Sequence, residues 1–80
     1  MPADTAQLVN YLVRSLVDDP DSATVVEKRN GEDLVYEVSV SPDDVGKLIG
    51  RQGRIVKAIR TLARAAGSAT GAHVDVEILG

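Results

Sequence analysis

The dipeptide Asn30-Gly31 is the sequence feature that most constrains the fold. Both residues tolerate positive φ angles, so between two strand-like runs this pair is a strong signal for a β-hairpin with a type I′ turn. The run 24–29 before it is rich in β-branched residues, and the run 34–40 after it alternates apolar with polar side chains. The sequence therefore predicts an antiparallel pair of strands.

A helix is expected before this hairpin. Apolar residues recur every three or four positions over 5–17, which is the period of a helix with one buried face. Asp4 is the expected N-cap, with Gln7 three residues later as its capping-box partner. The acidic, proline-containing run 18–21 ends the helix, and its carboxylates are interpreted as solvated rather than as a cation site.

Two further helices are expected after the hairpin. Ser41 is the predicted cap of a short helix, with Pro42 at its first position and Asp44 at the acidic position of a capping box. A longer helix is expected over 54–66. Its apolar arc consists of Ile55, Val56, Ile59, Leu62, Ala63 and Ala66, and its cationic side chains lie on the opposite arc.

The last element is a strand in which Val74, Val76 and Ile78 alternate with acidic residues. A right-handed two-helix crossover returns this strand parallel to the second one. The sequence thus predicts one α+β domain over 1–80, in the order α-β-β-α-α-β. Three helices cover one face of a mixed three-stranded sheet.

Composition excludes several classes of protein. The 80 residues contain no Cys, one His, two Tyr, and neither Phe nor Trp. A disulfide framework, a thiolate zinc site and a His-based metal site are therefore not expected, and neither is an aromatic stacking platform. No apolar run is long enough for a membrane span, and the first residues lack the pattern of a signal peptide. We expect a cytoplasmic protein without metal or cofactor.

Charge is divided sharply along the chain. The net charge is −3, yet the segment 45–74 contains no acidic residue and six of the nine cations. The other three cations and all 12 acids lie outside it. Such a run is often only a solvated helix face. So complete a separation instead favours a partner that carries negative charge.

The segment Gly50-Arg51-Gln52-Gly53 joins the two later helices with no other linker. Two glycines allow a tight turn and leave room for a ligand backbone to approach. The N–H groups at the start of the following helix attract anions such as phosphate, and Arg51 and Arg54 add positive charge there. A GxxG segment alone is weak evidence, because a helix–helix turn that needs glycine has the same pattern.

The run from Val45 to Ile55, VGKLIGRQGRI, resembles the signature of KH domains, whose GxxG loop clamps about four nucleotides. The element order is similar to the type II KH arrangement, and the length and the run 54–61 resemble the small bacterial KhpA proteins. The resemblance implies an RNA-binding protein and RNA chaperone that pairs with itself and with a KhpB-type partner. It also implies a role in cell-wall growth and cell shape.

The resemblance also implies a site. Single-stranded RNA would contact Lys47, Ile49, Gly50, Arg51, Gln52, Gly53, Arg54 and Lys57. Bases would lie in a groove between the short helix and the last strand. Val45, Ile49 and Ile55 are candidates for its apolar lining, and His73, Val74 and Val76 for the opposing wall. Without aromatic residues in the groove, we expect weak binding that tolerates many sequences.

Catalytic interpretations of the sequence are weaker than the RNA-binding one. A nucleotide-hydrolysing P-loop needs Lys-Ser/Thr after its second glycine, and Gly53 is followed by Arg54-Ile55. Asp43 and Asp44 are better explained by helix capping than by metal binding or acid–base catalysis. His73 is expected at a groove edge or the surface. No nucleophile, base and orienting group come together, so we expect a non-enzyme without a small-molecule substrate.

One alternative remains at this stage. A KH-like fold can serve mainly for dimerisation or docking, with only incidental RNA contact. The basic loop favours RNA binding, whereas the acidic background and the lack of aromatic residues favour the alternative. Tyr11 and Tyr36 are expected in the core of their elements and not at a stacking surface.

Overall fold

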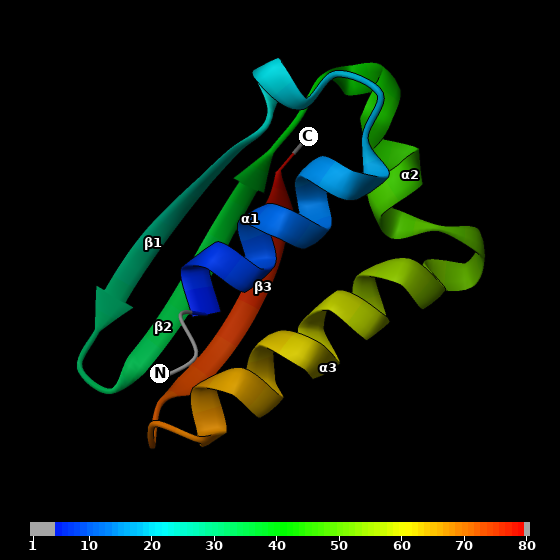
Figure 1. The fold of residues 1–80 in the computed structure, drawn as a ribbon. Coiled ribbons are helices and arrows are strands. Elements are labelled where there is room, and N and C mark those ends of the chain that lie inside the picture. Colours follow the sequence, from blue (N-terminus) through cyan, green and yellow to red (C-terminus); the bar gives the residue numbers. More distant parts are fainter. Residues whose placement is uncertain (1–4, 80) are drawn as a thin grey trace.

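The computed structural model describes residues 5–79 and confirms the predicted α+β fold and element order (Figure 1). The helices and strands are α1 (Thr5–Leu16), β1 (Thr24–Asn30), β2 (Asp33–Ser39), α2 (Val45–Ile49), α3 (Arg54–Ser68) and β3 (His73–Leu79). Short 3-10 turns lie at Pro20–Ser22, Pro42–Asp44 and Arg51–Gly53. The predicted N-cap, Asp4, lies outside the described residues.

The sheet has the order β1-β2-β3, with β1 antiparallel and β3 parallel to the central strand β2. The predicted hairpin is confirmed, but its turn differs from the predicted type. Asn30 pairs with Asp33, so the two turn residues are Gly31 and Glu32. Of these only Gly31 has a positive φ, +65°. A positive φ at the first turn residue alone is the pattern of a type II′ turn, which also suits the twist of a hairpin.

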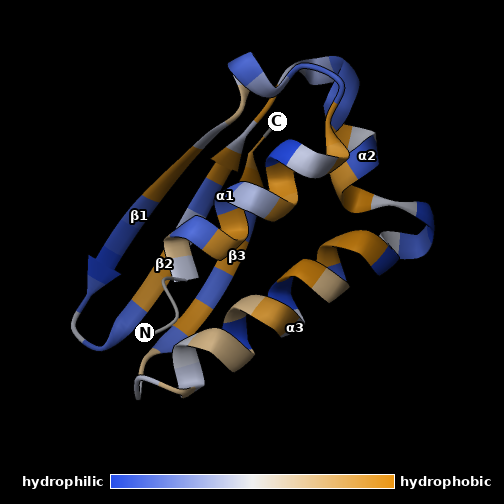
Figure 2. Ribbon diagram, viewed as in Figure 1, coloured by the Kyte–Doolittle hydropathy of each residue, from blue (hydrophilic) through white to orange (hydrophobic). Residues whose placement is uncertain are grey.

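One face of the sheet carries the core. Along β2 and β3, apolar residues alternate with hydrophilic ones (Figure 2). Tyr36, Val38 and Val76 point to the helical side and are almost completely buried. Val9 and Val13 of α1 are fully buried with them, and so are Ile59 and Ala63 of α3. Both long helices therefore cover the same face of the sheet (Figure 1), as periodicity indicates.

Two side chains that were expected to be buried are exposed. Tyr11 was predicted in the core and is 69% exposed, whereas Tyr36 is buried as predicted. Leu62, a member of the predicted apolar arc, is 48% exposed. α1 buries Thr5, Val9 and Val13, spaced four apart. Tyr11 lies midway between two of these residues along the chain and so projects from the opposite side of the helix.

The start of α2 also differs from the prediction. Ser41 makes no side-chain hydrogen bond to the helix, and Asp44 does not complete a capping box. Asp44 is only 2% exposed, and its carboxylate accepts hydrogen bonds from the backbone N–H groups of Asp18 (3.2 Å) and Asp19 (3.0 Å). This carboxylate therefore joins the end of α1 to the start of α2.

No helix within residues 5–79 has the length and apolar character needed to cross a membrane. Within the same residues, no cluster of three or more His, Cys, Asp or Glu side chains is arranged to hold a metal ion.

Candidate nucleic-acid interface

The loop between α2 and α3 follows an unusual backbone path. Gly50 has φ and ψ of 74° and 176°, and Gly53 has 72° and 16°. Between them Gln52 has a φ of 59°, which makes it the one non-glycine residue with positive φ in the described chain. Such conformations cost free energy and are concentrated at functional sites. Three positive φ angles within four residues turn the chain sharply from one helix into the next.

The two glycines have different roles in this turn. A Cβ atom on Gly50 would lie 2.5 Å from Cγ1 of Ile55, so the first glycine lets the loop pack directly on α3. A Cβ on Gly53 would meet only Val56, at 3.9 Å. Gly53 is therefore required for its backbone conformation alone, whereas Gly50 is required for both its conformation and its close packing.

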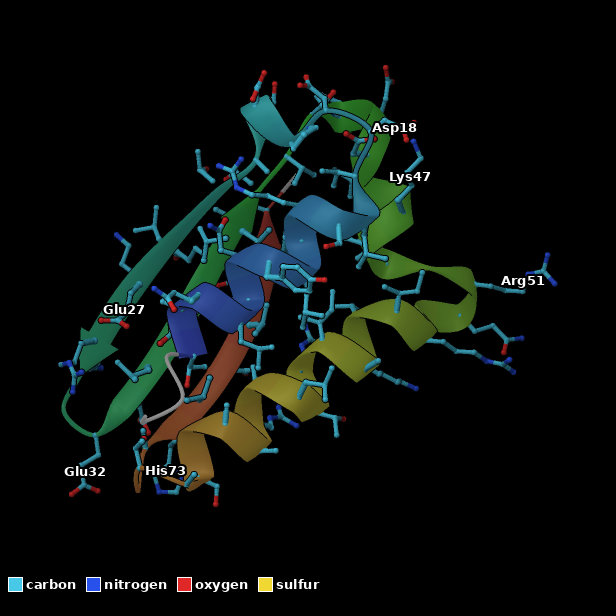
Figure 3. All side chains as sticks on the ribbon, in the orientation of Figure 1. Asp18, Glu27, Glu32, Lys47, Arg51 and His73 are labelled. Atoms are coloured by element: carbon cyan, nitrogen blue, oxygen red, sulfur yellow. The ribbon has the colours of Figure 1, made fainter. Side chains whose placement is uncertain are left out.

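Polar side chains project from the tip of the turn. Arg51 and Gln52 are exposed, and Arg51 extends into solvent away from the rest of the molecule (Figure 3). Nη2 of Arg54 donates a hydrogen bond to Oε1 of Gln52 at 3.2 Å. Lys57 is exposed one turn further along α3. None of these three cations, Arg51, Arg54 and Lys57, forms an ion pair with a described residue.

The loop also leads into the N-terminus of α3, a helix of 15 residues. Its N-cap, Gly53, has no side chain to cap the first N–H groups. These groups and the helix dipole form a positive end beside Arg51 and Arg54. The N–H of Arg54 donates to the carbonyl oxygen of Arg51, so this end of α3 attracts anions mainly through the helix dipole and the later N–H groups. Together with two guanidinium groups and an unobstructed backbone, it suits a phosphate group.

Lys47 lies away from the tip of the loop. Its Nζ forms ion pairs with Asp18 and, at 3.1 Å, with Asp44, and Figure 3 shows Lys47 directed toward Asp18. The hydrogen bonds to Asp18 and Asp44 raise the pKa of Lys47 above its ordinary value, against the opposing effect of burial. Among the predicted RNA contacts, Lys47 is thus the cation already neutralised by carboxylates.

The predicted groove is only partly formed as expected. Ile49 is 36% exposed, and Val45 and Ile55 are half-buried, so α2 offers an aliphatic surface next to the loop. The prediction for the opposing wall is wrong. Val74 and Val76 are buried in the core, and His73 lies at the opposite end of the molecule from Arg51 (Figure 3). The parallel register pairs His73 with Asp33, beside the hairpin turn.

Two more cations of the basic segment are paired on β3. Nε of Arg60 donates to the carbonyl oxygen of Val76 at 3.0 Å and lies 3.7 Å from Oδ1 of Asp75. Nη2 of Arg64 lies 3.4 Å from the same Asp75 oxygen. Sequence reasoning missed this role of Asp75, because the alternation of polar and apolar residues along β3 marked it only as an outward-facing side chain.

The family of the chain follows from its sequence over the same elements. A family model described as KhpA/KhpB, KH domain, matches residues 6–78, which include the loop and both flanking helices. The chain belongs to this KH-domain family. The order of helices and strands described above is therefore that of a KhpA/KhpB-type KH domain.

Curated relatives cover almost the same length. RNA-binding protein KhpA of Clostridium perfringens is 47% identical over 73 residues, which is 91% of this chain and 97% of the relative. The proteins of the same name from Listeria monocytogenes and Chlamydia pneumoniae are 41% and 37% identical, over 91% of this chain and 96% and 94% of their own lengths.

One solved structure has the same fold within a larger protein. Era from Aquifex aeolicus, crystallised with GDP and aluminium fluoride, superimposes with a TM-score of 0.63 at 24% identity. The match covers 92% of this chain and only 29% of the Era chain. At this identity the similarity concerns the fold alone.

Proposed function

We propose that this chain binds single-stranded RNA through Gly50-Arg51-Gln52-Gly53 and the N-terminus of α3, and that it does so without catalysis. The observation that carries the proposal is the sharply turned loop, which has no side-chain cap, beside Arg51, Arg54 and Lys57, three cations that form no ion pair with a described residue. The names of the relatives, RNA-binding protein KhpA, support the same ligand. Phosphate contacts of this kind position a strand without reading its bases.

The proposal also includes the partners of this chain and its role in the cell. We infer that the chain acts as a cytoplasmic RNA chaperone, both as a homodimer and together with a KhpB-type RNA-binding partner. Its proposed role lies in post-transcriptional control linked to cell-wall growth and cell shape. Membership of the KhpA/KhpB family supports this inference. A single loop grips only a few nucleotides, so a second RNA-binding unit would raise the overall affinity without any new type of contact.

The double variant Arg51→Asp, Gln52→Asp tests the site. Both side chains are exposed at the loop tip, and Asp tolerates the positive φ of position 52 better than most residues, so the fold should change in stability by no more than about 0.5 kcal/mol. RNA affinity should fall strongly, because two carboxylates would repel the phosphates. With Arg51→Ala alone, the slope of log affinity against log salt should decrease by about 0.7.

A charge-matched control is available at the other end of the molecule. Arg29→Asp with Asn30→Asp makes the same change in net charge on exposed residues of β1, beside the hairpin turn. This control should keep most of the RNA affinity. If the loop variant has a native circular dichroism spectrum and unchanged RNA affinity, the loop is not the RNA site. The alternative function, a dimerisation or docking module with incidental RNA contact, would then be preferred.

A further inference from the structure

The cations of α3 form a stripe that runs from the loop toward β3. Arg54, Lys57, Arg60 and Arg64 are spaced three, three and four residues apart, which places them on one side of the helix. At a rise of 1.5 Å per residue, the stripe extends about 15 Å along the helix axis. Arg54 and Lys57, its first half, form no ion pair with a described residue, and Arg60 and Arg64, its second half, contact β3.

The contact on β3 occupies the middle of the free edge of the sheet. β3 is an edge strand, so one of its sides has no neighbouring strand. At Val76 the carbonyl oxygen accepts a hydrogen bond from Arg60 Nε, and the N–H donates to Oδ1 of Asp75 at 2.8 Å. Side chains therefore satisfy the Val76 peptide groups in place of a further strand, which also protects this edge from pairing.

Oδ1 of Asp75 lies at the centre of this cluster. Oδ1 of Asp75 accepts from the Val76 N–H, lies 3.4 Å from Arg64 Nη2 and lies 3.7 Å from Arg60 Nε. One guanidinium group and a backbone N–H donate to this anionic oxygen, and a second guanidinium group, which donates to the Val76 carbonyl, lies beside it. Groups of this kind also bind phosphate oxygens. The side chains of Asp75, Arg60 and Arg64 are 56%, 39% and 59% exposed, so solvent and solutes reach them.

We propose that Arg60, Arg64 and the Val76 N–H form a second phosphate subsite for RNA, and that Asp75 occupies this subsite in the free protein. An RNA phosphate that enters the subsite displaces the Asp75 carboxylate from the arginines. Exposed ion pairs contribute little to stability, so this exchange costs the fold little. Asp75 thereby weakens RNA binding and confines tight contact to the loop end of the stripe.

This inference rests on the proposed RNA-binding function, because the stripe begins at the loop. A strand whose backbone is held at Gly50–Gly53 reaches Lys57 and then Arg60 by following α3. If RNA does not bind there, the contacts of Asp75 with Arg60 and Arg64 are only intramolecular salt bridges that hold α3 against the edge of the sheet. The two possibilities differ in what happens to RNA affinity when Asp75 loses its charge.

The test is the variant Asp75→Asn, assayed with a labelled single-stranded oligouridylate at fixed salt. Asn is isosteric, and its carbonyl oxygen still accepts the Val76 N–H, so the edge of β3 keeps its structure. Loss of two competing exposed ion pairs should tighten RNA binding roughly 3- to 10-fold. Glu77→Gln is the matched control: it removes one charge from the next outward-facing residue of β3, which forms no ion pair with a described residue. It should leave RNA affinity nearly unchanged.

A second pair of variants identifies the arginines as the cause. In the Arg60→Gln, Arg64→Gln background, adding Asp75→Asn should have no effect on RNA affinity. Equal gains in RNA affinity from Asp75→Asn and Glu77→Gln, a gain that persists without the arginines, or no gain at all would each overturn the subsite.

The loop is tested separately. If Arg51→Asp, Gln52→Asp loses RNA affinity while Asp75→Asn matches the wild type, the proposed function stands and the subsite does not. If the loop variant keeps its affinity while Asp75→Asn binds more tightly, the loop assignment fails instead.

Discussion

At the scale of single residues, Asp44 links the fold to the candidate site. Its carboxylate holds two backbone N–H groups after α1 and the ammonium group of Lys47 on α2. Burial on its own raises the pKa of Asp44, but the hydrogen bonds from Asp18, Asp19 and Lys47 outweigh it, so the pKa lies below its ordinary value. A buried carboxylate with this many donors fixes where α2 begins, and α2 leads directly into the loop.

Replacing Asp44 by Asn should therefore destabilise the protein. The amide loses the charge that faces Lys47, and its single carbonyl oxygen cannot accept from all three donors. At neutral pH we expect the melting temperature to fall by roughly 4–8 °C or more. Asp43→Asn, which changes the exposed neighbouring acid, is the control and should melt like the wild type.

The effect of Asp44 should depend on pH with a definite sign. Its folded-state pKa lies below the ordinary value of 3.8, so the unfolded chain takes up a proton first as the pH falls. The stabilisation is complete above that value and is lost as the pH falls through the folded-state pKa. Melting curves of wild type and Asp44→Asn should therefore converge below about pH 3.8 and differ by a constant amount near neutrality. A difference that persists unchanged in acid would contradict this role.

The sequence revealed residues whose role depends on close neighbours and missed those that depend on distant ones. The glycines and cations of the loop could be predicted because their backbone and charge act within four residues. Asp44 could not, since its partners lie 25 and 26 residues earlier in the chain. The same holds for the ion pair of Lys47 with Asp18, which lies 29 residues earlier in the chain.

At the scale of elements, the loop depends on its two glycines unequally. A side chain at Gly50 requires a φ of +74° with a ψ of 176°, a region that is essentially restricted to glycine, and its Cβ overlaps Ile55. A side chain at Gly53 meets no close atom and has only the cost of the left-handed conformation. The first glycine is thus a packing requirement, and the second a conformational one.

We therefore expect Gly50→Ala to lower the free energy of unfolding by at least about 2 kcal/mol and Gly53→Ala by about 1 kcal/mol. Urea denaturation of the two variants measures both costs. Ile55→Ala removes Cγ1, the atom nearest to the new Cβ, so Gly50→Ala with Ile55→Ala should be less destabilised than the sum of the two single variants. Equal destabilisation by the two alanine variants would show that contact with Ile55 does not distinguish the two positions.

The order of elements could be predicted almost completely, because hairpin signal, helical period and strand alternation are local patterns. The predicted turn type was wrong because the turn lies one residue later than expected. Asn30 pairs with Asp33, so the turn residues are Gly31 and Glu32. The paired state of Arg60 and Arg64 depends on how α3 lies against β3. No window of the sequence contains that information.

At the scale of the whole molecule, one face of the sheet is covered by helices and the other is not. Large apolar side chains remain exposed on both sides. Tyr11 and Leu62, 69% and 48% exposed, lie on the helices, and Val26, 48% exposed, lies on β1. Val26 neighbours Val25, which packs against the core, so alternation along the strand directs Val26 to the uncovered face. The accessible surface totals 5165 Å², and a standard interface would cover about 800 Å² of each partner.

We expect the chain to self-associate through the helical face, because Tyr11 and Leu62 lie on two helices that cover the same side of the sheet (Figure 1). Leu62→Lys should shift sedimentation toward monomer at high micromolar concentration. Its effect on melting at low concentration should be small, because the side chain is half exposed. Val26→Lys is the matched control, since it introduces the same charge at a site of equal exposure on the opposite face. If Val26→Lys abolishes association and Leu62→Lys does not, the open sheet face is the interface. If the wild type sediments as a monomer throughout, RNA avidity requires a different partner.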